Sequence, residues 1–136
     1  MKIIGVDFGD SRTGYAISDI LGFSANVLEA FKCKRIDGVA DYTVGLAKEL
    51  GAEKIVLGFP KNMNGTIGPR AEKVTLLADM IKERIDIPII LWDERLTTVS
   101  AHNLMNETNV RGKKRKESVD SISAAYILQG YLDSIR

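Results

Sequence analysis

The chain has 136 residues, of which 45% are hydrophobic and 27% are charged, an ordinary balance for one globular domain. Its single cysteine, Cys33, excludes an internal disulfide, and no apolar stretch approaches the length of a membrane span. We therefore expect a single soluble domain over residues 1–136, located in the cytoplasm and without a membrane partner.

The first part of the chain predicts an antiparallel set of strands. Apolar runs lie at 3–8, 13–18 and 25–31, and the turn residues 9–12 separate the first two runs. Short polar connections of this kind join neighbouring strands into hairpins. The three runs therefore predict an antiparallel meander.

The rest of the chain predicts an alternation of helices and strands. Continuous apolar runs at 54–59 and 87–92 are typical of strands that are covered on both faces. Segments with apolar residues at helical spacing lie at 39–51, 70–85, 97–107 and 118–135. This order favours parallel strands joined by right-handed helical crossovers. The expected fold class is α/β, with a mixed five-stranded sheet and helices on its faces.

Four acidic residues lie where an apolar element meets a polar segment. Asp7 ends the first strand, and Asp93 and Glu94 directly follow the last one. Asp120 shares one face of the final helix with apolar residues only, so it is expected to face the sheet. The apolar members of that face are Ala124, Ile127, Leu128 and Tyr131. Each acid alone has a structural explanation, as a turn residue, a solvated strand end or a residue at the positive end of a helix.

Together the acids predict one site, because ligands bind beyond the carboxyl ends of strands in open α/β sheets. Clustered carboxylates repel one another unless cations intervene, and Mg²⁺ or Mn²⁺ prefers oxygen ligands. The lone His102 and the lone Cys33 argue against zinc. Two such cations about 3.5–4 Å apart activate a water and stabilise the leaving oxygen of a phosphodiester. The acidic set therefore predicts metal-dependent phosphodiester hydrolysis.

The net charge is only +1, but one segment concentrates the cations. The segment RGKKRK holds Arg111, Lys113, Lys114, Arg115 and Lys116. Without these five cations, 14 of the 19 basic residues remain against 18 acidic ones, so the rest of the chain is at −4. Such a segment is either a solvated loop or a contact for a polyanion, whose phosphates Lys and Arg neutralise without reading sequence. It ends four residues before Asp120, at the rim of the predicted site.

Four stretches carry a resemblance to a known family. They are GVDFGDSRTGYAIS at 5–18, GFPKNMNGTIGPRA at 58–71, DERLTT at 93–98 and KESVDSISAAYIL at 116–128. In this order they resemble the YqgF family, whose members are described as RuvC-like Holliday junction resolvases or as pre-16S rRNA nucleases. The resemblance implies a ribonuclease H-like fold, with a five-stranded sheet whose first three strands are antiparallel. It also implies that Asp7 and Asp120 are metal ligands, with Glu94 as the third acid and Asp93 as the alternative.

The same resemblance suggests contacts for nucleic acid. Arg12, in the first hairpin, is a candidate phosphate contact. The long loop after the fourth strand supplies Lys61, Asn62 and Arg70, whose other interpretation is an ordinary surface loop. Arg95 either supports the site or belongs to the start of the next helix. The glycines at 5 and 9 are expected to let metal and phosphate approach the backbone around the first acid.

The main hypothesis is a metal-dependent endonuclease that processes the 5′ end of pre-16S rRNA. Resolution of branched DNA is the alternative within the same chemistry. Two other classes are a non-catalytic RNA-binding factor and an ATP-binding module, because DFGDSRTGYAIS also resembles the phosphate-binding hairpin of actin and the sugar kinases. Those proteins enclose ATP between two such domains, and this chain supplies one. A monomer and a homodimer both stay open.

Overall fold

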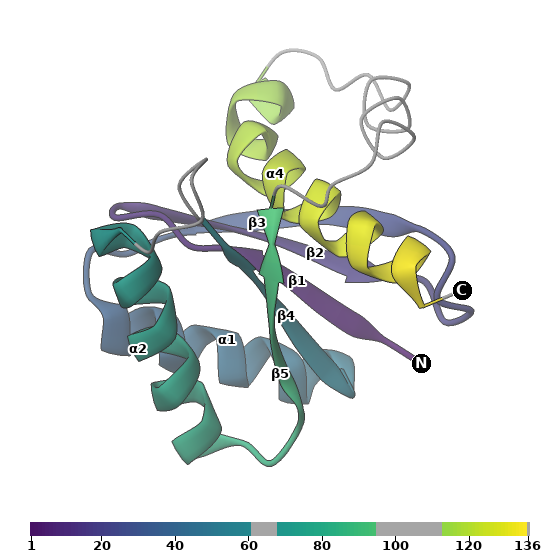
Figure 1. Cartoon of the computed structure of the whole chain (residues 1–136). Helices are drawn as coiled ribbons and strands as arrows, with labels where there is room; N and C mark the ends of the chain where they lie inside the picture. Colours follow the sequence, from purple (N-terminus) through teal and green to yellow (C-terminus); the bar gives the residue numbers. More distant parts are fainter. Residues whose placement is uncertain (61–67, 95–112, 136) are drawn as a thin grey trace.

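The computed structural model describes residues 1–60, 68–94 and 113–135, and of 113–120 it describes the backbone alone. Five strands form one sheet in the order β3-β2-β1-β4-β5 (Figure 1). They are β1 (Ile3–Asp7), β2 (Arg12–Ser18), β3 (Ala25–Lys32), β4 (Lys54–Phe59) and β5 (Ile89–Asp93). The pairs β1–β2 and β2–β3 are antiparallel, whereas β1–β4 and β4–β5 are parallel. The expected mixed sheet with an antiparallel first half is confirmed.

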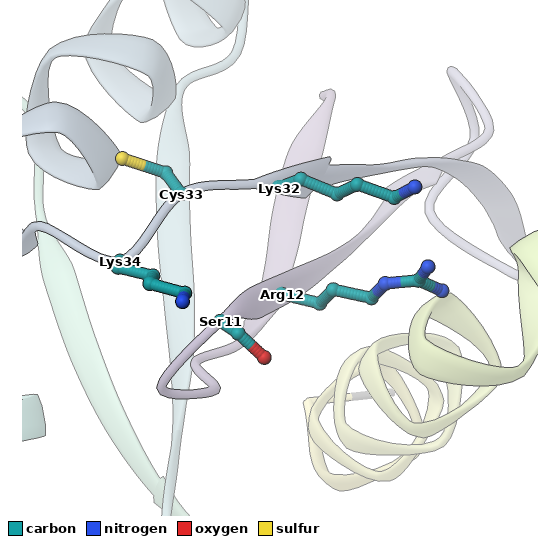
Figure 2. A pocket seen from close by; sticks show the side chains of 5 residues that line it. All are labelled: Ser11, Arg12, Lys32, Cys33 and Lys34. Carbon is teal, nitrogen blue, oxygen red and sulfur yellow. The ribbon is translucent and has the colours of Figure 1, made fainter.

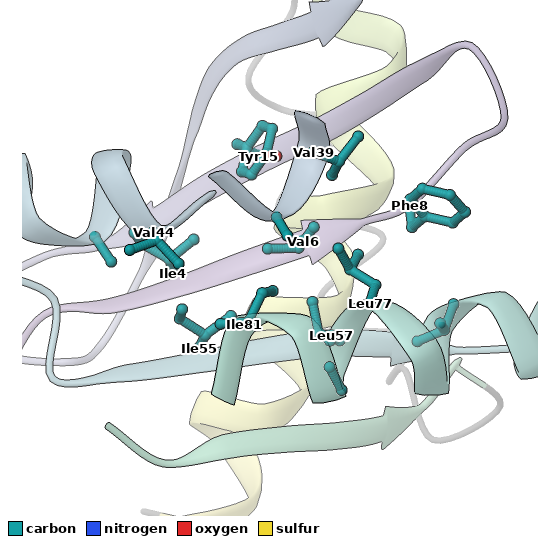
Figure 3. Packing of buried hydrophobic residues seen from close by; sticks show 14 of the residues in the cluster. Ile4, Val6, Phe8, Tyr15, Val39, Val44, Ile55, Leu57, Leu77 and Ile81 are labelled. Atoms are coloured by element: carbon teal, nitrogen blue, oxygen red, sulfur yellow. The ribbon is translucent and has the colours of Figure 1, made fainter. Parts of the chain in front are cut away.

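Helices cover both faces of this sheet. The helices α1 (Ile36–Leu50) and α2 (Pro69–Arg84) lie on one face, and α4 (Lys113–Ser134) crosses the other (Figure 1). Alternate residues of each strand therefore enter two separate cores. In β1, Ile4 and Val6 pack toward α1 and α2 (Figure 3), whereas Ile3 packs in the cluster that includes α4. None of the helices in the described ranges combines the length and the apolar character needed to cross a membrane.

Two glycines near Asp7 have packing reasons that differ from the expected ones. A side chain at Gly5 would bring its Cβ to 2.7 Å from Leu128 Cβ and 2.9 Å from the carbonyl oxygen of Ala124. Gly5 therefore lets α4 approach β1 closely. A Cβ at Gly9 would collide with the carbonyl oxygen of Arg12, so this glycine permits a tight turn. The contacts found at both positions are with the protein's own backbone and core.

Three elements begin two or more residues from their predicted starts. The final helix begins at Lys113 rather than at 118, so residues 113–116 of the basic segment are helical and are not a loop. Lys, Arg and Glu are good helix formers but lack the apolar periodicity that marks a helix in sequence. The first helix begins at Ile36, three residues before the predicted start, and β5 begins at Ile89, two residues later than predicted. The helix expected over 97–107 lies outside the described residues.

Candidate active site

Asp7 lies at the carboxyl end of the central strand β1. It pairs with Gly14 of β2, and the residue before it, Val6, pairs with Leu57 of β4. Because Gly5 faces α4, strand alternation also places Asp7 on the α4 face of the sheet. Its side chain is half-buried there. The strand thus delivers one carboxylate to the end of the sheet, beside the start of β2.

Glu94 directly follows β5 and lies over a glycine in the neighbouring strand β4. A Cβ at Gly58 would be 2.7 Å from Glu94 Oε1 and would also collide with the tip of Ile127 from α4. The carboxylate of Glu94 is therefore on the α4 face. Gly58 follows Leu57, so it stands beside Asp7 in the parallel β1–β4 pair. Asp7 and Glu94 thus lie on the same face at the same end of the sheet, on either side of Gly58.

Gly58 was not predicted as part of a site. The signal for it is a glycine that interrupts the otherwise continuous apolar strand KIVLGF. A glycine inside a central strand marks a position where another group approaches closely. Here the approaching groups come from α4 and from the residue after β5.

Asp93 and Glu94 lie on different faces of the sheet. Asp93 pairs with Phe59, whose side chain packs in the core beneath α1 and α2. Its neighbour Trp92 packs in the other core, edge-on to Tyr131 of α4 with ring centroids 5.7 Å apart. Strand alternation therefore directs Asp93 away from the face that carries Glu94. This arrangement supports the preference for Glu94 over Asp93 as the partner of Asp7.

Charges around Glu94 act in opposite directions. Burial raises the pKa of the Glu94 carboxyl, the positive charge of Arg70 lowers it, and the negative charge of Asp93 raises it. Arg70 lies in the first turn of α2, and its Nη2 donates a 2.8 Å hydrogen bond to the carbonyl oxygen of Phe8. Arg70 therefore fixes the end of β1, one residue after Asp7, while its charge acts on Glu94.

A second contact ties the first hairpin to α2. Lys73 Nζ donates to Asp10 Oδ1 at 3.0 Å, and this hydrogen bond with its charge lowers the pKa of the exposed Asp10 carboxyl. Exposed ion pairs contribute little to stability, so the main effect is to orient the turn between β1 and β2.

The helix α4 is anchored beside Asp7 by a buried hydrogen bond. The backbone N–H of Tyr15 donates to Ser121 Oγ at 3.2 Å, next to a register shift in the β2–β3 pair between Thr13 and Tyr15. The ladder is irregular at this point, and Ser121 accepts the hydrogen bond of this buried N–H. Tyr15 adjoins the residue that pairs with Asp7, so the backbone of α4 at 121 is held close to the end of β1.

Asp120 precedes Ser121 in this helix, and its side chain lies outside the described residues. The four apolar residues predicted to share its face, Ala124, Ile127, Leu128 and Tyr131, are all buried. That part of the prediction is confirmed. Within the residues that the structure describes, no group of three or more acids, histidines or cysteines surrounds a common point. The described pair of carboxylates supplies hard oxygen ligands, which fit Mg²⁺ or Mn²⁺, and a third ligand at Asp120 stays a prediction.

Comparison with known proteins identifies the family. A family model described as RuvX, Holliday junction resolvase, matches residues 1–134. The chain belongs to the RuvX family. Two relatives are named as proposed pre-16S rRNA nucleases. The protein from Clostridium tetani is 48% identical over 135 residues, covering 99% of this chain and 98% of its own. The protein from Bacillus licheniformis is 43% identical over 139 residues, covering 99% of both chains. The resemblance found in the motifs is thereby confirmed.

Solved structures confirm the ribonuclease H-like fold of this RuvX chain. The Thermus thermophilus RuvC in complex with a Holliday junction substrate superposes with a TM-score of 0.67 at 12% identity, covering 98% of this chain and 96% of that one. The fowlpox virus Holliday junction resolvase gives a TM-score of 0.59 at 14% identity, covering 98% and 99%. At such identities the similarity concerns the fold.

The remaining predicted contacts of the RuvX chain are only partly described. Arg12 is half-buried at the start of β2, and Arg70 is bonded to the backbone of Phe8. Lys61, Asn62, Arg95 and Arg111 lie outside the described residues, as do the side chains of Lys113, Lys114, Arg115 and Lys116. Their contacts with nucleic acid stay predictions.

Proposed function

We propose that this RuvX protein is a metal-dependent endonuclease that processes the 5′ end of pre-16S rRNA. The observation that carries the proposal is the placement of the Asp7 and Glu94 carboxylates on one face of the sheet, on either side of Gly58. The names of relatives that are 43–48% identical over nearly the whole chain support the choice of substrate. A ribosomal precursor as substrate agrees with the cytoplasmic location expected from the sequence.

In this proposal Asp7 and Glu94, with Asp120, hold Mg²⁺ or Mn²⁺. The bound ions supply an activated water and stabilise the leaving oxygen of the phosphodiester. Glu94 must be ionised to bind a cation, and the positive charge of Arg70 favours that form against burial. Arg70 also holds the backbone that follows Asp7. Phosphate contacts of the substrate are assigned to Arg12, to Arg70 and to the basic start of α4.

The test compares Asp7→Asn and Glu94→Gln with Asp93→Asn, a matched change on the opposite face. Cleavage of an RNA that contains the 5′ precursor segment is measured with Mg²⁺ and with Mn²⁺. A bound cation is worth several kcal/mol at the transition state. The first two variants should therefore lose about 100-fold or more in rate, at 1.36 kcal/mol for each factor of ten. Asp93→Asn should stay within a few-fold of the wild type. Wild-type cleavage by Asp7→Asn would refute the proposal, as would equal losses in all three variants.

Resolution of branched DNA is the second candidate, favoured by the description of the family model and by the RuvC-like fold. The same carboxylates would act, so a side-by-side assay on the precursor RNA and a four-way DNA junction separates the two. A resolvase must cut two opposed strands, so this candidate also requires the homodimer rather than the monomer in sedimentation. Binding of the precursor RNA without cleavage of either nucleic acid would instead indicate a non-catalytic RNA-binding factor.

A further inference from the structure

A basic hollow lies beside the proposed acids, at the end of the β2–β3 pair. Its volume is about 390 Å³, and it is lined by Ser11, Arg12, Lys32, Cys33 and Lys34 (Figure 2). Three of these five residues are cationic and none is acidic. The backbone N–H of Cys33 donates to the carbonyl oxygen of Ser11 at 3.0 Å, so the two segments that form the hollow are held together. We call this feature the basic hollow.

Two of its cations are neighbours on adjacent strands. Arg12 and Lys32 are direct partners in the antiparallel β2–β3 pair. Figure 2 shows their side chains extending side by side in the same direction, while Cys33 points the other way. Like charges directly opposite each other destabilise a pair of strands. An anion bound beside these two residues is attracted to both positive charges.

The basic hollow shares its face of the sheet with the proposed acids. Phe31 stacks on Tyr42 of α1, with ring centroids 4.0 Å apart, so the next residue, Lys32, is directed to the α4 face. Its partner Arg12 lies on the same face, two residues before Gly14, the partner of Asp7.

The hollow also lies at the same end of the sheet as those acids. Neighbouring strands are about 4.8 Å apart, so β3 lies about 10 Å from β1. Along this end of the sheet, from β3 to β5, the residues follow in the order Lys32, Arg12, Asp7, Gly58 and Glu94. The carboxylates therefore lie at the proposed cleavage point, and the cations lie on one side of it.

We infer that the basic hollow binds a backbone phosphate of the nucleic-acid strand. The next phosphodiester of the same strand then lies at Asp7 and Glu94, where it is cut. The inference rests on the proposed function for the position of the cut, and on the hollow itself for the anion. The guanidinium of Arg12 donates two parallel hydrogen bonds to phosphate oxygens, and the ammonium groups of Lys32 and Lys34 add charge. Within the described residues, neither lysine forms an ion pair with a carboxylate.

Such a contact positions the strand without reading its sequence. It also differs from the basic start of α4, because it comes from the antiparallel edge of the sheet. Sequence reasoning missed it because Lys32 and Lys34 are 20 or more residues from Arg12 and meet it only through strand register. The available signal is the KCK segment at 32–34, which begins with the last residue of β3.

The test uses the salt dependence of binding, measured without divalent cations so that cleavage plays no part. Fluorescence anisotropy gives the Kd of the labelled precursor RNA at several salt concentrations for the wild type and for a Lys32→Gln/Lys34→Gln variant. Loss of one phosphate contact should flatten the slope of log K against log salt by about 0.7–0.9. The matched control is Lys48→Gln/Lys82→Gln, which removes two exposed lysines from the helices on the opposite face. The control should leave the slope unchanged.

An unchanged slope in the hollow variant would overturn the inference, as would an equal change in the control. A third arm titrates inorganic phosphate into the wild type by calorimetry. Phosphate binding that the hollow variant loses, together with an unchanged RNA slope, would indicate a site for a free anion instead and would also overturn it. If Asp7→Asn cleaves normally while the hollow variant shows the flatter slope of log K against log salt, the proposed function fails and the phosphate contact stands.

Discussion

Gly58→Ala tests whether the space between β1 and β5 matters for the proposed chemistry. The new Cβ would stand 2.7 Å from Glu94 Oε1, whereas ordinary contacts begin at 3.4 Å. Both the carboxylate of Glu94 and the tip of Ile127 must therefore move, the carboxylate by roughly 0.7 Å and the tip of Ile127 by more. Both groups are the far ends of flexible side chains, so the stability cost should lie near the lower end of the ~1–3 kcal/mol typical of overpacking. A displacement of about 1 Å in a catalytic group costs up to about 100-fold in rate.

We therefore expect Gly58→Ala to lower kcat for the precursor RNA by about 10- to 100-fold while the protein stays folded at the assay temperature. Thermal unfolding and single-turnover cleavage are measured on the same samples. The matched control is Gly45→Ala in α1, where a Cβ meets nothing within 4 Å. This variant should cleave normally, and its free energy of unfolding should rise by about 0.5–1 kcal/mol. Wild-type cleavage by folded Gly58→Ala would refute the reasoning, because Glu94 would then tolerate the displacement.

Two further predictions concern the groups that hold the site. Arg70→Gln removes the charge that lowers the pKa of Glu94, so that pKa should rise further and the acid limb of the rate–pH profile should move to higher pH. Because the folded pKa of Glu94 is raised, its proton stabilises the metal-free fold at low pH. This stabilisation is lost as the pH rises through the folded value, and a carbon-13 titration of Glu94 in both proteins measures the shift. A lower or unchanged pKa in Arg70→Gln would contradict this account. Ser121→Ala leaves the buried N–H of Tyr15 without its acceptor and should cost about 1–3 kcal/mol in urea unfolding, whereas Ser123→Ala, exposed on the same helix, should cost far less. Equal costs would show that the hydrogen bond does not anchor α4.

The sheet could be predicted from sequence because its signals are local. The run at 55–59 has no charged or polar side chain, and the structure places it in the interior of the sheet with both faces covered. Strand alternation also places Asp93, the last residue of β5, and Glu94, the next residue, on opposite faces. The short polar connections predicted the antiparallel order of the first three strands, and the family resemblance implied the same order.

The packing around the site could not be predicted in the same way. The reason for Gly5 is the close approach of Leu128, which is 123 positions away in the chain, so no local pattern reveals it. The basic hollow depends on the register that pairs Arg12 with Lys32. The early start of α4 was missed because its first residues are charged and carry no apolar period. Register and helix docking are set by the whole core, so these features follow only from the folded chain.

The central claim is that Asp7 and Glu94 share a divalent-cation site with Asp120. Crystals grown with Mn²⁺ test it most directly, because anomalous scattering locates the ions independently of the protein atoms. We expect Mn²⁺ with oxygen ligands from Asp7, Glu94 and Asp120 on the α4 face of the sheet, and loss of the ions in Asp7→Asn crystals. Ions bound only elsewhere, or a site that includes Asp93 in place of Glu94, would contradict it.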